Sequence, residues 1–349
     1  MMSTRRFGCV YFLILRDPLD FARDFGLVKI GITSGDVTRR ISTLQTGNPY
    51  ELVLFESLQT HWPREVEHFM HRVHAKDMLR SEWIRCNLEG LPALIHEART
   101  ALERIEKRKD RETALATTES NGRTRRATLP AFQMHREARD ISRRLVPAKL
   151  RLQTAEALLH AFTADTSGLE GVVRVWWFQP SQRFDIRLAE ARFPEITAGC
   201  QRPAVQGSFR WRRMPRPTDF PDEYEAAADA THFAQVAVAS CLRAGGALQP
   251  RVTRTQEVER WHDEYLQILP AVKRLEGDLA DVRTELAHGL GEYDAMDPVC
   301  SFVRRSTTQL DIAKFRTDFP EEYRHCVAPV DAQLRKMIYP NRSYLPLEP

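Results

Sequence analysis

The sequence predicts an α+β fold, in which a small three-stranded sheet, antiparallel or mixed, is flanked by helices and followed by a mainly helical C-terminal region. Two β-type runs lie within the first 32 residues, and a long charged stretch at 255–289 has helical apolar periodicity. With 349 residues, of which 42% are hydrophobic, the chain is long enough for two or three domains with real cores.

Two strands are predicted first. Residues 8–15 are continuously apolar, and residues 27–32 alternate, which places Lys29 and Gly31 opposite the apolar face. The polar link between these runs contains proline and glycine, so we expect an antiparallel hairpin with a long loop.

A helix, a third strand and a longer helix are predicted next. Asp36 is a suitable N-cap and Gly47 a suitable stop for the first helix, and residues 51–58 have the composition of a strand. The longer helix begins near Pro63. Its apolar stripe follows the i, i+3, i+4, i+7 spacing of a buried helix face, at Val66, Phe69, Met70 and Val73.

We expect three regions along the chain: a domain at 1–100, a basic helix and flexible linker at 101–150, and an accessory region at 151–349 that divides near residue 245. The formal net charge is +4, whereas residues 103–149 alone carry +6 and the rest sums to −2. The Ser/Thr/Gly-rich stretch 116–132 predicts the flexible linker.

Two hypotheses exist for this basic segment. It is either a set of solvated charged helices joined by a tether, or a surface that contacts the DNA backbone. In the second hypothesis the linker arginines make the contact, namely Arg123, Arg125 and Arg126.

Several classes of protein are excluded. No apolar run reaches the roughly 18 residues of a membrane span, and the short N-terminal run lacks a small-residue cleavage site, so we expect no membrane partner and no signal peptide. The six cysteines are far apart and form no C-x-x-C pair. They are expected to be free thiols in a reducing cytoplasm.

The C-terminal region contains a weak internal repeat. Residues 183–196 and 309–323 both run from an apolar-Asp-Ile segment to Phe-Pro-Glu, and residues 217–227 carry a partial third copy. These turns are typical of helix starts in an accessory domain. Alternatively, the region grips DNA ends, or binds a protein partner or a second copy of the chain.

Aromatic and arginine residues adjoin one another at 176–178 and 210–213. Such pairs suit a nucleic-acid or protein interface. Burial in a strand is the simpler explanation for Trp176 and Trp177.

Polar residues stand out at five positions of the N-terminal region. Tyr11 is central in the first strand, Lys29 lies in the second, and Arg40 lies in the first helix. Glu67 and His71 are one turn apart on the longer helix. Each alone has an ordinary explanation, as a packed aromatic, a solvated arginine or an i, i+4 pair.

Zinc is an alternative use of the histidines. His68, His71 and His74 could bind it together with Cys86, but the paired-ligand spacing of known zinc sites is missing.

Taken in order, these residues resemble the GIY-YIG nuclease superfamily. The matching pieces are CVY at 9–11, KIG at 29–31, Arg40 followed by STLQTGNP, Glu67 with His71, and EW at 82–83. The pattern is most similar to the phage open-reading-frame-172, MUG-type branch and covers residues 7–97. The D-x-x-x-h-x-x-x-P-E-x-Y pattern near the C-terminus is weakly similar to the tails of YqaJ-type, lambda-exonuclease-like phage recombinases.

The resemblance implies a DNA endonuclease or nickase of a bacterium or phage that uses one Mg²⁺ or Mn²⁺ ion. Carried over to this chain, it implies that Glu67 holds the metal and that Arg40 stabilises the phosphate charge. Tyr11 or Lys29 would orient or deprotonate the attacking water. A carboxylate suits a hard cation, and a metal and an arginine together neutralise the developing charge.

Other positions complete or depart from the family pattern. His71 joins the catalytic set through the E-x-x-x-H motif, and Gly31 would let the backbone approach the phosphate. Lys29 replaces the second motif tyrosine, and the final asparagine has no clear match near Glu82 or Asn87. Two alternatives therefore stay open: a DNA-binding protein with weak or no cleavage, and a scaffold whose C-terminal region binds a protein.

Overall fold

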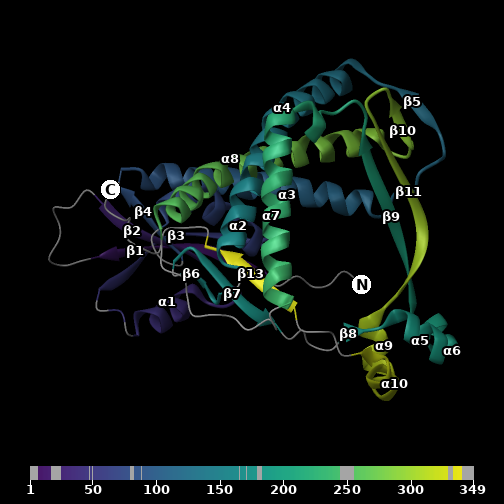
Figure 1. Cartoon of the computed structure of the whole chain (residues 1–349). Helices are drawn as coiled ribbons and strands as arrows, with labels where there is room; N and C mark the ends of the chain where they lie inside the picture. Colours follow the sequence, from purple (N-terminus) through teal and green to yellow (C-terminus); the bar gives the residue numbers. More distant parts are fainter. Residues whose placement is uncertain are drawn as a thin grey trace.

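The computed structural model describes residues 7–16, 25–46, 48, 50–78, 82–87, 89–164, 166–169, 171–178, 183–243, 255–328 and 333–339. The predicted helix stop at Gly47, the link after the first strand and the predicted division near 245 lie outside them. The protein is mixed α+β, as predicted. A sheet lies on one side, long helices run through the middle, and a two-stranded ribbon lies on the other side (Figure 1).

The N-terminal sheet has four antiparallel strands in the order β3-β1-β2-β4. Their bounds are β1 Gly8–Arg16, β2 Phe25–Thr33, β3 Glu51–Thr60 and β4 Trp83–Asn87. The first three are the predicted strands, and the predicted hairpin joins β1 to β2. The fourth strand was missed because its five residues are too short to show a period.

Successive side chains along each strand point to opposite sides, so this sheet has two different faces. On one face, Val10, Phe12 and Ile30 are buried against α2 (Pro63–Val73) and α3 (Leu91–Leu115). The predicted apolar stripe of α2 packs here. On the opposite face, Tyr11 and Leu13 pack against α1 (Val37–Gln45). The Asp36 carboxylate caps α1 by accepting the Arg39 N–H at 2.8 Å, as the sequence predicted.

Long helices form the centre of the molecule. They are α4 (Leu129–Phe162), α7 (Pro221–Arg243) and α8 (Gln256–Leu290). α4 packs along both α7 and α8, and α8 also contacts α2 and α3. The main core includes Leu159, Leu269 and Val272. The predicted domain boundaries at 100 and 150 fall inside α3 and α4, so neither marks a break in the chain.

The stretch interpreted as a flexible linker is held by backbone pairing instead. β5 (Thr124–Arg126) pairs in parallel with β10 (Ala295–Asp297). Just before it, the Ser120 N–H donates to the Arg304 carbonyl at 3.2 Å. Composition could not reveal this pairing, because polar and glycine-rich segments suit both tethers and edge strands.

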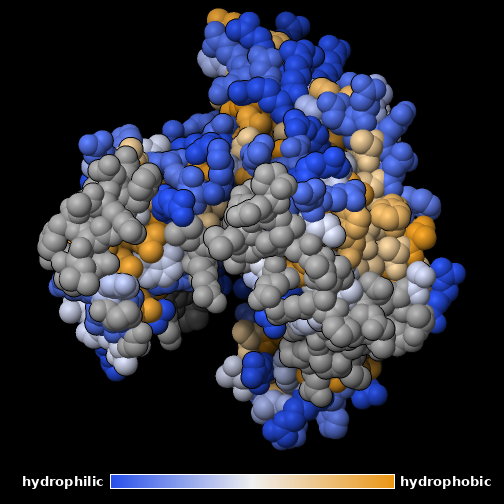
Figure 2. Space-filling model, turned by 60° about the vertical axis from the view of Figure 1, so that its left-hand side comes forward, coloured by the Kyte–Doolittle hydropathy of each residue, from blue (hydrophilic) through white to orange (hydrophobic). Residues whose placement is uncertain are grey.

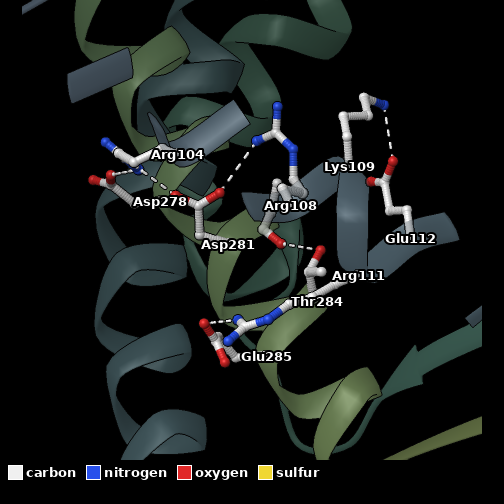
Figure 3. Close-up of polar contacts among 10 residues, drawn as sticks. Arg104, Arg108, Lys109, Arg111, Glu112, Asp278, Asp281, Thr284 and Glu285 are labelled. Carbon is white, nitrogen blue, oxygen red and sulfur yellow. Dashed lines mark hydrogen bonds and ion pairs between the residues drawn. The ribbon is translucent and has the colours of Figure 1, made fainter. Parts of the chain in front are cut away.

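The basic face of α3 is matched by an acidic face of α8 (Figure 3). Arg104 binds Asp278 at 2.6 Å and Asp281 at 2.7 Å, and Arg108 reaches Asp281 at 3.2 Å. Two more pairs link α3 to α8, Lys107–Glu285 and Arg111–Glu285, and two link α4 to α8, Lys149–Glu276 and Arg151–Glu264. Much of the positive charge of residues 103–149 is therefore compensated inside the molecule.

The C-terminal region is mainly helical, as predicted, but it also contains sheets. β9 (Gln201–Trp211) and β11 (Cys300–Leu310) form a long antiparallel ribbon that continues into β10 and β5. A three-stranded sheet has the order β13-β7-β6, with bounds β6 Gly168–Leu169, β7 Val173–Phe178 and β13 Gln333–Ile338. Trp176 is a partly buried strand residue of β7, as the simpler interpretation held.

The two repeat copies form a small module at the end of the ribbon (Figure 1). The first comprises β8 Arg183–Phe184, α5 Ile186–Arg192 and α6 Pro194–Gly199, and the second comprises α9 Ile312–Asp318, α10 Pro320–His325 and β12 Val327–Ala328. The Asp185 N–H donates to the Cys326 carbonyl and the Asp311 N–H to the Cys200 carbonyl, both at 2.8 Å. The two copies therefore pack against each other through equivalent backbone hydrogen bonds, in an arrangement with near two-fold symmetry.

The third copy shares only the helix start. η2 (Pro217–Asp219) leads into Phe220 and Pro221, where α7 begins. Its backbone at Phe220 matches that of Phe193 and Phe319, with φ near −130° in all three. These turns are helix starts with proline in the first turn, as the structural interpretation predicted.

The surface is mostly polar, and hydrophobic residues form separate patches on the face in Figure 2. Among the described residues no helix is long and apolar enough to cross a membrane. The five cysteines that the structure describes are free, as predicted.

Candidate active site at the edge of the N-terminal sheet

Tyr11 fills the space beside Gly31. The two residues face each other across β1 and β2, and Tyr11 is 1% exposed. A Cβ added to Gly31 would lie 2.5 Å from the Tyr11 hydroxyl oxygen. The sequence suggested that this glycine leaves room for a phosphate. In the structure the room is occupied by the tyrosine ring, so the glycine positions Tyr11.

Gly31→Ala should displace Tyr11 and destabilise the fold by about 1–3 kcal/mol, since the added methyl overpacks a buried ring. Gly35→Ala is the matched control, because its nearest neighbouring atom would be 3.8 Å from the new Cβ. Urea unfolding of both variants measures the difference. Equal stabilities would contradict the positioning role of Gly31.

Arg40 reaches Tyr11 from α1. Its Nε donates to the Tyr11 hydroxyl at 3.5 Å, while the side chain is otherwise exposed. Burial raises the pKa of Tyr11, although Arg40 opposes the shift, so the phenol stays protonated at neutral pH. The outer guanidinium nitrogens remain open to solvent, where they suit bidentate binding of a phosphate.

Lys29 is held by two neighbours on the same side of the sheet. Its ammonium forms an ion pair with Glu82 and lies 5.7 Å from the centre of the Trp83 ring. Lys29 is only 8% exposed. An ammonium has only donors and no acceptor, so Lys29 places positive charge beside the site.

Glu67 is a buried carboxylate without a partner. It is 8% exposed and makes no hydrogen bond or ion pair with any described residue. Burial first, and then the nearby Glu82, raise the pKa of Glu67 to about 7, while Lys29 and Arg64 oppose the shift. Strongly shifted carboxyl groups of this kind concentrate at functional sites.

Glu67 lies on α2, which packs beside the edge of β2. β4 pairs with β2 only as far as Lys29, so no described strand pairs with the β4-side edge of β2 beyond that point. At Ile30 the backbone N–H donates to the Glu82 carbonyl at 3.1 Å, whereas the Ile30 carbonyl oxygen faces α2, where His71 Nε2 is 3.1 Å away. Glu67 sits one turn earlier on the same helix.

His71 has a defined protonation pattern. Because the Ile30 carbonyl can only accept, Nε2 must carry the proton, which leaves Nδ1 with a lone pair. Burial lowers the pKa of His71, so the ring is neutral at neutral pH.

The described residues contain no cluster of three His, Cys, Asp or Glu side chains that could hold a metal ion. His74 binds Glu97 at 2.9 Å and His71 binds the backbone, so the geometry lends the zinc hypothesis no support. Magnesium makes different demands, since it is commonly held by one or two carboxylates together with waters and phosphate oxygens. The buried, unpaired Glu67 fits that role.

The structure brings together Tyr11, Lys29, Arg40, Glu67 and His71, but not the linker arginines. β5 lies across the molecule from β1 and β2 (Figure 1). Arg125 binds the Gly289 carbonyl and lies 5.6 Å from the centre of the Tyr293 ring, so it is engaged by the fold. Arg123 and Arg126 are exposed.

Sequence reasoning missed the part that Glu82 plays. This residue binds Lys29 and raises the pKa of Glu67, and it directly precedes β4. The available signal was the Glu-Trp pair itself.

Comparison with protein-family models, curated proteins and solved structures finds no match to this chain.

Proposed function

We propose that the chain is a DNA endonuclease or nickase that hydrolyses a phosphodiester with one divalent metal ion, Mg²⁺ or Mn²⁺. The observation that carries this proposal is the buried carboxylate of Glu67, which has no hydrogen-bond or ion-pair partner among the described residues and lies near Glu82 and Lys29. The ordered motif resemblance to the GIY-YIG superfamily supports the same chemistry and favours DNA as the substrate.

The phosphate is bound by positive charge from two elements. Arg40 offers its outer guanidinium nitrogens from α1, and Lys29 adds the charge of a fixed ammonium from β2. The protonated Tyr11 hydroxyl orients Arg40, since their contact is 3.5 Å. These groups favour the transition state because negative charge grows on the phosphate oxygens as water attacks.

Glu67 would hold the metal ion, with Glu82 close enough to add to the negative potential. When bound, the ion supplies Lewis-acid stabilisation of the phosphate charge. The rest of its ligands would be waters and phosphate oxygens.

His71 is the best proton acceptor of the site. Nδ1 has a free lone pair at neutral pH, whereas Tyr11 is protonated and Lys29 is ion-paired. Water forms a bond to phosphorus and gives its proton to Nδ1, the bond from phosphorus to the leaving deoxyribose oxygen breaks, and that oxygen takes a proton from solvent.

Supercoiled plasmid tests the proposal. Wild-type protein should convert it to nicked circles with Mg²⁺ or Mn²⁺ but not with chelator. Glu67→Gln should lower the rate about 100-fold or more, because the metal ligand is lost. Glu65→Gln is the matched control, since Glu65 is exposed on the same helix two residues earlier. It should cleave like wild type.

Two results would overturn the nuclease assignment. One is wild-type protein that binds duplex DNA but never nicks it, which favours the DNA-binding alternative. The other is equal cleavage by wild type and Glu67→Gln. Absence of any DNA binding at low salt would favour the scaffold alternative.

A further inference from the structure

The β9–β11 ribbon carries an exposed face with an unusual composition. The two strands pair over eleven residues each, from Gln201 opposite Leu310 to Trp211 opposite Cys300. Neither strand contains a single Asp or Glu. No described strand pairs with the outer edge of β9.

Successive side chains of a strand point to opposite sides, so the β9–β11 ribbon has two faces. Phe209, Trp211 and Phe302 lie on the inner face and pack on a core with α4 and α8. The outer face presents arginine, amide and hydroxyl side chains: Arg202, Gln206, Ser208, Arg210, Arg305 and Gln309. Arg202, Arg210 and Arg305 are exposed and make no ion pair with any described residue.

This free charge contrasts with the basic helices. On α3, Arg104, Arg108 and Arg111 are bound to carboxylates of α8. The positive charge of α3 is therefore paired, whereas Arg202, Arg210 and Arg305 form no ion pair with a described residue, and the nearest carboxylate effect on them is that of Asp311 on Arg202. Unpaired arginines on a polar strand surface are suited to an anionic partner.

We propose that the outer face of the β9–β11 ribbon binds in the major groove of duplex DNA. The inference rests on the proposed function in taking duplex DNA as the substrate, and it assigns the surface that grips that substrate. A two-stranded ribbon fits the major groove of B-form DNA. Arginines reach phosphates or guanine edges, and glutamines match adenine edges.

Double-stranded RNA is a poorer partner for this surface. Its major groove is deep and narrow, so a ribbon cannot enter it. The ribbon could also serve only as a stalk for the repeat module at its end. In that case its arginines would contribute nothing to nucleic-acid binding, which makes the two roles separable.

The test compares two triple variants of the full chain. R202Q/R210Q/R305Q removes the ribbon charge, and R136Q/R144Q/R283Q removes the same charge from exposed, unpaired arginines of α4 and α8. Binding to a 30-base-pair duplex is followed by fluorescence anisotropy in chelator at several salt concentrations. Thermal melts confirm that both variants are folded.

The ribbon variant should bind about 10- to 100-fold more weakly at 0.1 M salt. The slope of log affinity against log salt should flatten by roughly 2–3, as expected for three lost phosphate contacts. The helix variant should stay within about twofold of wild type. Equal losses in both variants, or none in the ribbon variant, would overturn the proposal.

A second experiment tests whether the ribbon binds in the major groove. A duplex with bulky groups at the 5-position of cytosine, which fill the major groove, should bind weakly, whereas netropsin in the minor groove should not compete. Equal affinity for duplex RNA through the same arginines would overturn the groove assignment.

The outcome is distinguishable from failure of the nuclease proposal. Figure 1 places the ribbon and the β1–β4 sheet on opposite sides of the helices, so ribbon changes leave the reacting groups intact. Metal-dependent nicking with unchanged binding by the ribbon variant would refute only the ribbon inference. Loss of binding by that variant in a protein that never nicks DNA would refute only the nuclease.

Discussion

Replacing Glu67 with glutamine should stabilise the metal-free protein at neutral pH by about 1–3 kcal/mol, even though the same change should slow cleavage strongly. The pKa of this carboxyl rises from its ordinary value of 4.5 to about 7 in the folded protein. A shift of that size means that the charged carboxylate lowers the free energy of unfolding by roughly 3 kcal/mol. Glutamine has nearly the same shape and no charge, so it removes most of this cost.

The sign of the pH dependence follows from proton uptake. Between about pH 4.5 and 7 the folded protein holds a proton on Glu67 that the unfolded chain has released. This contribution to stability is therefore fully present below pH 4.5 and is lost as the pH rises towards 7. Urea unfolding of wild type and Glu67→Gln at pH 5 and pH 8, in chelator, should show a gap in stability that is several times larger at pH 8 than at pH 5. A gap of equal size at both values would contradict the role of the charge.

The same carboxylate gives metal binding a readout that does not depend on cleavage. A ligand that binds only the folded state raises its stability. Mg²⁺ should therefore raise the melting temperature of wild type and of Glu65→Gln at pH 8, but not that of Glu67→Gln. At pH 6 the effect should weaken, because the proton on Glu67 competes with the metal. Equal Mg²⁺ shifts in all three proteins would exclude Glu67 as the ligand.

Local patterns were sufficient for the elements that build the candidate site. The strands around Tyr11 and Lys29, the cap at Asp36 and the apolar stripe of α2 all follow from periodicity and end signals over a few residues. The contacts between these elements do not. That Tyr11 fills the gap at Gly31 depends on the register of β1 against β2, which neither strand shows alone.

Charge was harder to interpret from the sequence. Summing along the chain singled out residues 103–149, but Arg104 and Arg108 are bound to Asp281, which lies far along the chain. The informative feature was the absence of Asp and Glu from both ribbon strands. Each strand by itself carries only two arginines, which is too small an excess to stand out in a sum along the chain, and the two strands are adjacent only in space.

The repeat was visible in the sequence, but its meaning required the fold. Similar short segments predicted similar local structure, and both copies do form a helix, a Phe-Pro turn and a second helix. What the pattern could not show is that the copies share one core. Cys200 and Cys326 occupy equivalent positions at the ends of the copies, and both are fully buried.

Phe315→Ala should unfold the first copy of the repeat as well as the second. Phe315 is fully buried in the shared core and meets the Phe184 ring of the first copy at 5.3 Å between centroids. Removing such a side chain costs about 3–5 kcal/mol. Hydrogen exchange should therefore accelerate at 183–200 as well as at 309–328, while the N-terminal sheet is unaffected. The control is Ile312→Ala, because Ile312 is 36% exposed in the same copy.

The near symmetry of the module predicts a partial rescue. Ala189 is the counterpart of Phe315 in the first copy, and both are 0% exposed in the same core. Ala189→Phe alone should overpack this core. Combined with Phe315→Ala, it restores the total side-chain volume from the opposite side, and should recover a large part of the lost exchange protection. Additive damage in the double variant would mean that the two positions do not share one volume, and that the copies are alike in backbone only.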